Sequence, residues 1–398
     1  MVPRPVGRAP IGVKATRRGC CESHFQSRGI HLPEREVQRT GEESILTTGM
    51  KRTLKRATLQ LLRSTGVFGL VRDSAWRMHR LLILCYHGIS LEDEHLWRPA
   101  LYIEPSLLEQ RLEFLAQGRY NVLPLGEAVK LLREEKLPPR SVTITFDDGT
   151  YDFLKLAYPL LRRFGFPATV YQTTYYSELQ IPVFNLMCSY LLWKRRGSIL
   201  DKGTELGLKP PLDLTSEAKR EAIVQILVDN CERGGLCARQ KNEVAGKLAQ
   251  LLDVDYSEIL SKRILQLMNP QEIAELAREG FDFQLHTHRH RTPQDKVLFQ
   301  KEIRDNRESL AKSLPGQSRH FCYPSGVYSP IFLPWLAEDN ILSATTCDVG
   351  LADASTNPLL LPRMVETSSR SPLEFEGWLT GVADFMAIHR AAAQHYDE

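Results

Sequence analysis

Short apolar runs alternate with amphipathic stretches from residue 81 onward. Apolar or β-branched runs predict strands at 81–86, 141–146, 167–173, 281–286, 319–324 and 341–347. Apolar residues at helical spacing predict helices at 104–117, 125–135, 151–164, 294–313 and 329–339. Strands and helices in alternation, with short loops between them, predict a parallel sheet with helices outside, either a barrel or an open doubly wound sheet.

One long stretch interrupts this alternation. Residues 175–268 begin with an aromatic, apolar segment and continue with polar helix formers punctuated by glycine and charged residues. We predict that they form a mostly helical insertion emerging from a loop between a strand and a helix, because folds of this class accept additions there.

The first 80 residues differ from the rest of the chain in charge and composition. They hold 16 Lys and Arg against 6 Asp and Glu, although the net charge of the 398-residue chain is only +3. We expect residues 1–49 to be a disordered extension and residues 50–80 a basic amphipathic segment. Residues 51–70 could contact a membrane as an interfacial helix, or pack as an ordinary surface helix on the barrel.

Export and membrane insertion are not indicated by the sequence. Residues 1–49 lack the apolar centre of a secretory signal, and Arg63 and Arg72 interrupt the apolar residues that follow. No apolar run reaches the roughly 18 residues that span a bilayer. We therefore expect a cytoplasmic protein.

The composition is that of a soluble globular protein. Hydrophobic residues make up 42% of the chain and charged residues 25%, which excludes a wholly disordered chain, a collagen and a disulfide miniprotein. The eight cysteines show no zinc-ribbon spacing and are expected to be reduced thiols. The basic N-terminal region does not specifically indicate a nucleic-acid partner.

Two adjacent aspartates, Asp147 and Asp148, follow the strand expected at 141–146. Successive side chains on a strand point to opposite faces, so both can serve one cavity only where the strand ends. Gly149 permits the bend that this requires. Taken alone, the pair is better explained as a solvated turn or a helix cap.

Three histidines, His286, His288 and His290, follow the strand expected at 281–286. Two imidazoles with a carboxylate form a common catalytic zinc set that leaves one position for water, and the spacing of His286 and His290 suits it. The alternative is an exposed polar loop, which such a concentration of histidines makes the weaker explanation. We expect His288, between the two ligands, to face solvent.

A turn at 323–326, with the sequence Tyr-Pro-Ser-Gly, follows the strand expected at 319–324. Its proline and glycine could fix backbone N–H groups toward the cavity, as an oxyanion site requires. Turns of this composition are common, so this signal is weak by itself.

Together these motifs resemble the polysaccharide deacetylases with a NodB homology domain, carbohydrate esterase family 4. Residues 145–149 (Thr-Phe-Asp-Asp-Gly) resemble the first family motif, and residues 286–290 the second, His-Ser/Thr-x-x-His. Residues 85–90 resemble the start of the branch that acts on exopolysaccharides. The resemblance covers about 81–173 and 270–366, within a deacetylase domain spanning 81–398, and implies a distorted (β/α)7-type barrel.

The resemblance also implies a role for each matching residue. Asp148, His286 and His290 would bind a divalent metal, usually zinc in this family, and Asp147 would be the general base. The oxyanion would be held by the metal and by a backbone N–H near Ser325.

The sequence departs from the family pattern at the third and last motifs. The turn at 323–326 lacks the arginine that normally tunes the base, for which Arg319 is a weak candidate. Arg363 stands near the position where the family carries Leu-x-His. It could orient Asp147, bind substrate beside Tyr323, or form a plain surface salt bridge.

The identity of the general acid is consequently not determined by the sequence. His87, at the end of the first strand, is the best-placed candidate, although a histidine packed into the mouth of the barrel is equally consistent with the sequence. His389 lies near the C-terminus and fits the family motif poorly.

The sequence thus predicts a metal-dependent hydrolase that removes N-acetyl groups from sugars of a bacterial polysaccharide or oligosaccharide. One alternative is a carbohydrate-binding or scaffold barrel without catalysis. Another is a metal-dependent hydrolase that acts on a different acylated small molecule through the same site.

Overall fold

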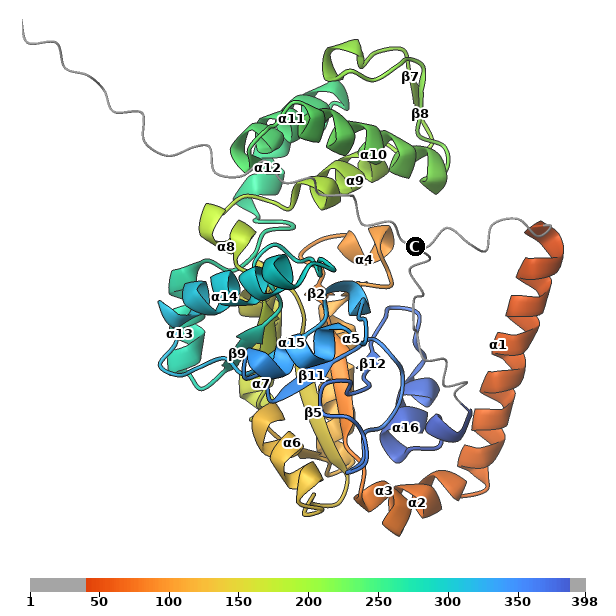
Figure 1. Ribbon diagram of the computed structural model, residues 1–398. Helices are drawn as coiled ribbons and strands as arrows, with labels where there is room; N and C mark the ends of the chain where they lie inside the picture. Colours follow the sequence, from red (N-terminus) through yellow and green to blue (C-terminus); the bar gives the residue numbers. More distant parts are fainter. Residues whose placement is uncertain (1–40, 387–398) are drawn as a thin grey trace, which may run out of the picture.

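The computed structural model describes residues 41–386, with side chains described from residue 53 onward. Its centre is an eight-stranded sheet in which all strand pairings are parallel (Figure 1). The strands follow the order β11 (Ser343–Thr345), β10 (His320–Cys322), β9 (Asp282–Leu285), β6 (Thr169–Gln172), β5 (Ser141–Phe146), β1 (Leu82–Tyr86) and β12 (Met364–Val365), with β4 (Asn121–Val122) paired to β5. All six strands predicted from apolar runs are present.

The two ends of this strand path are joined by one short segment of chain. Leu361 forms a parallel bridge with Thr345 of β11, and its N–H donates to the Ala344 carbonyl at 2.9 Å. Three residues later, Met364 of β12 pairs with Leu84 of β1. The sheet is therefore curled into a distorted barrel, which confirms the (β/α)7-type fold class and excludes the open doubly wound sheet.

Helices cover the outside of the barrel, as the alternating pattern predicts. They are α5 (Pro105–Gln117), α6 (Leu125–Arg133), η1 (Phe153–Ala157), α7 (Tyr158–Phe164), α13 (Pro270–Arg278), α14 (Lys296–Ala311) and α15 (Phe332–Glu338). Leu108, Leu112 and Leu115 of α5 are buried, since a helical spacing of three to four residues puts them on one face. The single helix expected at 151–164 begins instead with the π-helical turn η1.

The predicted mostly helical insertion is present and has its own apolar core. It contains α8 (Tyr175–Leu179), α9 (Phe184–Lys194), β7 (Ile199–Leu200), η2 (Thr204–Leu206), β8 (Leu212–Asp213), α10 (Glu217–Arg233), α11 (Ala238–Leu251) and α12 (Tyr256–Ser261). The small antiparallel pair β7–β8 was not expected. Trp97 and Tyr102, which precede the insertion in the chain, pack into this second core.

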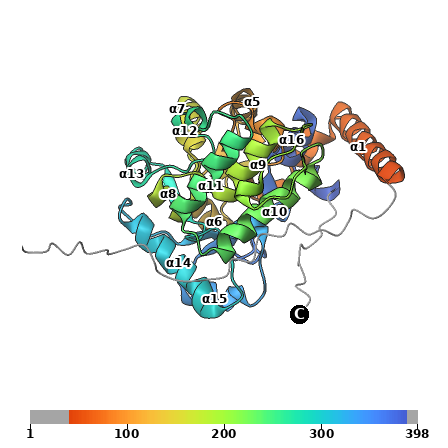
Figure 2. The ribbon, with the colours of Figure 1, turned by 90° about the horizontal axis from the view of Figure 1, so that it is seen from above.

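The insertion lies over the end of the barrel where the strands finish. Figure 1 shows α9–α11 above this end, near α4 (Glu94–Trp97) and β2 (Gly88–Ile89), which pairs with β3 (Tyr102–Ile103), and Figure 2 shows the same helices from above. Asp93, just before α4, accepts hydrogen bonds from the Tyr190 hydroxyl at 2.5 Å and the Lys194 ammonium at 2.6 Å. These contacts hold the insertion against the loop that follows β1.

The N-terminal helices pack against the last part of the chain. α1 (Gly41–Ser64), α2 (Val67–Arg72) and α3 (Ala75–Met78) lie beside α16 (Pro372–Thr380) and η4 (Asp384–Met386). Arg63 pairs with Glu376 at 2.7 Å, and Leu59 is buried. Leu54 and Leu61 of α1 remain exposed, and membrane contact through residues 51–70 stays a prediction.

The expected N-terminal boundary needs one correction. Residues 41–49 are helical, where disorder was predicted, because no proline after Pro33 stops the helix before it runs into the basic segment. Residues 1–40 lie outside the described residues. Within the described part of the chain, no helix has the length and apolar character needed to cross a bilayer.

Candidate active site

The two aspartates after β5 lie in a sharp turn. Asp148 and Gly149 both have left-handed backbone conformations, with φ of 68° and 76°, so the chain bends directly after Asp147. A Cβ atom at Gly149 would lie 1.9 Å from Oε1 of Gln172, so a larger residue there would have to displace that buried side chain and adopt a strained backbone conformation. The predicted bend at the end of the strand is therefore present.

The loop after β9 brings His286 and His290 to Asp148. Nε2 of His286 lies 3.3 Å from Oδ1 of Asp148, and Nε2 of His290 lies 3.2 Å from the same oxygen. One ligand atom from each of the three residues lies within 4.8 Å of the others. The three predicted metal ligands, from strand ends 138 residues apart in sequence, therefore converge.

The hydrogen bonds of His286 suit a divalent cation at this place. Its Nδ1 lies 2.8 Å from the Cys322 carbonyl oxygen, so Nδ1 carries the proton and Nε2 offers a lone pair. Nε2 is buried and has no hydrogen-bond partner among the described residues. Burial would raise the pKa of Asp148, but the His290 and His286 rings outweigh it and lower that pKa well below its usual range. Two imidazoles and one ionised carboxylate are a donor set that zinc accepts.

Asp147 is held by Arg363 in a fully buried pair. The guanidinium Nη1 lies 2.7 Å from Oδ1 of Asp147, and Nη2 lies 2.7 Å from Oδ2. Burial would raise the pKa of Asp147, but the charge of Arg363 outweighs it and holds this pKa far below its usual range. Asp147 is consequently ionised and fixed in orientation.

This geometry decides between the roles considered for Arg363. Its side chain has no solvent exposure, so it is not a surface salt bridge, and its contact with Asp147 favours orientation of the base over contact with substrate. Arg319 instead reaches the Asn340 carbonyl, at 3.5 Å. Of the two arginines considered, Arg363 is therefore the one that contacts Asp147.

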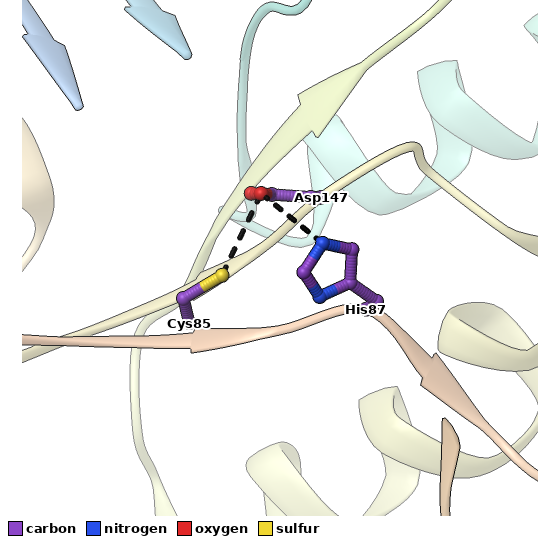
Figure 3. A group of neighbouring side chains, drawn as sticks. All are labelled: Cys85, His87 and Asp147. Carbon is purple, nitrogen blue, oxygen red and sulfur yellow. Dashed lines mark hydrogen bonds and ion pairs between the residues drawn. The ribbon is translucent and has the colours of Figure 1, made fainter. Parts of the chain in front are cut away.

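His87 points at Asp147 from the end of β1. Figure 3 shows its ring and the Cys85 thiol directed at the Asp147 carboxylate, with Nε2 of His87 3.7 Å from Oδ2. Burial lowers the pKa of His87 despite the nearby carboxylates, so the ring is neutral at pH 7. Its Nδ1 is buried without a hydrogen-bond partner among the described residues.

The two residues proposed near the oxyanion lie at the turn after β10, η3 (Pro324–Gly326): Tyr323 directly precedes the turn, and Ser325 lies within it. The Tyr323 hydroxyl donates to the Leu359 carbonyl at 3.1 Å, and its N–H donates to the Thr345 carbonyl at 3.2 Å. Both Tyr323 donors are therefore already used inside the barrel. Ser325 is exposed, with φ of 56°, and stays the candidate for a backbone donor.

The expectation that His288 faces solvent is wrong. Its side chain is 8% exposed, and its Nδ1 lies 2.8 Å from the Thr174 hydroxyl. The loop folds back onto the barrel because its backbone bonds to α14, so the residue between the two ligands points inward. His389 lies outside the described residues.

Sequence reasoning missed the support that α14 gives to this loop. Oδ1 of Asn306 accepts a hydrogen bond from the His286 N–H at 3.0 Å, while its amide donates to the Gln172 carbonyl at 3.0 Å. Asn306 is fully buried. The available signal was a polar residue on the inward face of an otherwise amphipathic helix, which helical periodicity alone could have identified.

Comparison with known proteins identifies the motif regions. A family model described as polysaccharide deacetylase matches residues 134–209 and 252–342. These ranges contain both aspartates and both histidine ligands, but neither His87 nor Arg363. The match confirms the resemblance predicted from the sequence.

Individual relatives match over short stretches. The Bacillus subtilis protein YxkH, described as a candidate polysaccharide deacetylase, is 34% identical over 103 residues, 25% of this chain and 35% of that protein. The Escherichia coli poly-β-1,6-N-acetyl-D-glucosamine N-deacetylase is 26% identical over 100 residues, 25% of this chain and 15% of that enzyme. The matched stretches thus span 35% of the length of the first relative and 15% of the length of the second.

Solved deacetylases resemble the chain over a larger part. The Streptococcus pyogenes deacetylase PplD, in complex with acetate, is 21% identical with a TM-score of 0.49, covering 74% of this chain and 96% of that one. IcaB from Ammonifex degensii is 16% identical with a TM-score of 0.47, covering 76% and 97%.

Proposed function

We propose that this member of the polysaccharide deacetylase family is a metal-dependent hydrolase that removes N-acetyl groups from sugars of a bacterial polysaccharide or oligosaccharide. The observation that carries the proposal is the convergence of Asp148, His286 and His290 beside an ionised, oriented Asp147. A barrel that only binds carbohydrate has no need for a fixed carboxylate next to such a ligand set.

Each residue of the site has its own role in the proposed reaction. A divalent cation held by Asp148, His286 and His290, with zinc the first candidate, would activate water and polarise the amide carbonyl. Asp147 accepts the proton that the attacking water loses. A carboxylate with so low a pKa is a weak base, so it can act only on water whose own pKa has been lowered.

Arg363 prepares Asp147 for that step. The two parallel hydrogen bonds fix both carboxylate oxygens, so the base does not have to reorient when substrate arrives. Against the effect of burial, the charge of Arg363 also lowers the pKa of Asp147, which favours the ionised form that a general base requires. Arg363 acts through Asp147 and does not touch the sugar.

His87 is the proposed general acid. Because its ring is neutral in the resting protein, it can protonate the leaving amine only after it has gained a proton during the reaction. Nε2 lies 3.7 Å from the carboxylate that takes up the proton, which a small rotation of the ring would shorten to hydrogen-bonding distance. Ser325 is proposed to offer its backbone N–H to the oxyanion.

The substrate class follows from the family and from one relative. The Escherichia coli relative is named as acting on poly-β-1,6-N-acetyl-D-glucosamine. We propose N-acetylglucosamine oligomers as the first substrates to test.

The test is release of acetate by the zinc-loaded full chain. Acetate is measured with N-acetylglucosamine oligomers, and with acylated compounds that are not sugars. We expect acetate from the oligomers, none from His286→Ala, and full activity from His79→Ala, which changes an exposed histidine outside the site. A zinc-bound protein that binds oligomers without releasing acetate would instead be a binding barrel. Preferential release from the other compounds would point to a different acylated substrate.

A further inference from the structure

Two arginines flank the metal-ligand candidate His290, and both bind one buried carboxylate. Nη1 of Arg289 lies 3.2 Å from Oε1 of Glu302, and Nε of Arg291 lies 2.6 Å from the same oxygen. Glu302 is on α14, and its side chain is 1% exposed. The two arginine side chains are about one-third exposed, so the carboxylate is the fixed partner.

The backbone of the same loop also bonds to Glu302. The Arg289 N–H donates to Oε2 at 2.9 Å, and the His288 N–H donates to the Glu302 backbone carbonyl at 3.1 Å. Both carboxylate oxygens and the backbone carbonyl of Glu302 therefore receive hydrogen bonds from three residues close to His290 in the loop, namely His288, Arg289 and Arg291. These contacts fix the loop on both sides of His290.

The loop needs such support because of its backbone. Thr287 and His290 both have left-handed conformations, with φ of 62° and 54°, which non-glycine residues adopt at a cost in free energy. The Thr287 hydroxyl accepts the Arg291 N–H at 3.0 Å, but this bond lies within the loop itself. Contacts to a rigid neighbouring element are what can hold a strained loop in one conformation, and α14 supplies them.

We propose that Glu302 is a positioning residue that sets the cation affinity of the site by holding His290 in its ligating position. This inference rests on the cation site of the proposed function. It assigns Glu302 no contact with substrate or cation. Residues that orient metal ligands from outside the ligand set change metal affinity by about 10- to 100-fold when they are replaced.

A competing explanation is electrostatic. Glu302 could matter only because its charge offsets Arg289 and Arg291, which otherwise repel a cation. The two explanations differ for Arg291→Gln. If the field alone matters, removal of a positive charge tightens cation binding; if position matters, loss of the bond to Glu302 weakens it.

The experiment measures the Zn²⁺ dissociation constant of the full chain by competition with a chromogenic chelator. The variants are Glu302→Gln, Arg291→Gln and, as a control on the exposed face of the same helix, Glu308→Gln. We expect about 10- to 100-fold weaker binding for Glu302→Gln, several-fold weaker binding for Arg291→Gln and no change for Glu308→Gln. The visible spectrum of bound Co²⁺ should change in the first two variants, since it reports ligand geometry.

The possible results separate the positioning role of Glu302 from the electrostatic explanation and from the proposed function. Unchanged affinity in Glu302→Gln, or tighter binding in Arg291→Gln, overturns the positioning role while the proposed function stands. Should Glu302→Gln fail to fold, Arg291→Gln decides alone, because that side chain is partly exposed. If the unaltered protein binds no Zn²⁺, the cation site and this inference both fall. If Glu302 behaves as expected but no glycan yields acetate, only the proposed function falls.

Discussion

The ion pair of Asp147 and Arg363 at the end of the barrel is fully buried, whereas the ion pair of Lys219 and Asp213 in the insertion stays partly in solvent. The Arg363 and Asp147 side chains are 0% and 3% exposed, while Lys219 and Asp213 of the insertion are 54% and 32% exposed. Removing one partner of a buried pair leaves an uncompensated charge, but an exposed pair loses little because water replaces the partner. We therefore expect the proposed base Asp147 to lie in the part of the molecule that is most sensitive to substitution.

The largest effect is expected where the buried pair is broken. Arg363→Met leaves Asp147 ionised, buried and without its partner, so we expect the free energy of unfolding to fall by about 3–5 kcal/mol. Urea unfolding followed by circular dichroism measures this. The matched change in the insertion, Lys219→Met, should leave the free energy of unfolding nearly unchanged, because water replaces the lost partner. Similar losses for both variants would contradict the comparison.

A second buried carboxyl group, that of Asp152, tests how burial affects the pKa when no cationic partner is present within the described part of the chain. Asp152 accepts the Ile89 N–H at 2.8 Å and the Thr150 hydroxyl at 3.0 Å, and no cation pairs with it among residues 53–386. Burial is the main cause that raises the pKa of Asp152 to about 7. In the unfolded chain an aspartate has a pKa of about 3.9, so the folded protein binds this proton more tightly.

The sign of the pH dependence follows from that difference. Between about pH 4 and 7 the folded state holds more protons, so the stability contribution of Asp152 is lost as pH rises, by at most about 1.4 kcal/mol per pH unit. Asp152→Asn mimics the protonated form and should remove this decline. Thermal unfolding at several pH values measures it, with the exposed insertion residue Asp201→Asn as control. A variant that declines as steeply as the unaltered protein would refute the raised pKa.

The smallest effect is expected at the contact between the two regions. Asp93→Ala removes the acceptor for Tyr190 and Lys194, whose bonds hold the insertion to the loop after β1. Because this carboxylate is partly exposed, we expect a loss of about 1–2 kcal/mol and no change in zinc content. Chemical unfolding and metal analysis of the same sample check both. Loss of zinc in this variant would show that the insertion supports the metal site.

The sequence predicted the parts of the molecule that depend on local pattern. The apolar runs gave all six predicted strands, and the motif spacing placed Asp148, His286 and His290 at strand ends, which the parallel sheet then brings together. Helical periodicity likewise found the helix ending before Gly118.

The features that the sequence left open or predicted wrongly depend mostly on contacts between distant segments of the chain. The sequence offered contact with Asp147 as only one of three roles for Arg363, because the two residues meet where β12 closes the barrel beside β1 and lie 216 residues apart in the chain. His288 is buried because α14 binds its loop, although a polar loop of histidines suggests exposure. The pair β7–β8 has strands of two residues each, too short for a period-two pattern.

The most direct test of the central claim measures zinc content and acetate release together for Asp147→Asn and His286→Ala. Asp147→Asn should keep one zinc ion per chain, which also shows that it is folded, while kcat on N-acetylglucosamine oligomers falls by about 10²- to 10⁴-fold. His286→Ala should lose both zinc and activity. An Asp147→Asn variant with an undiminished rate, or a His286→Ala variant with full zinc content, would contradict the account.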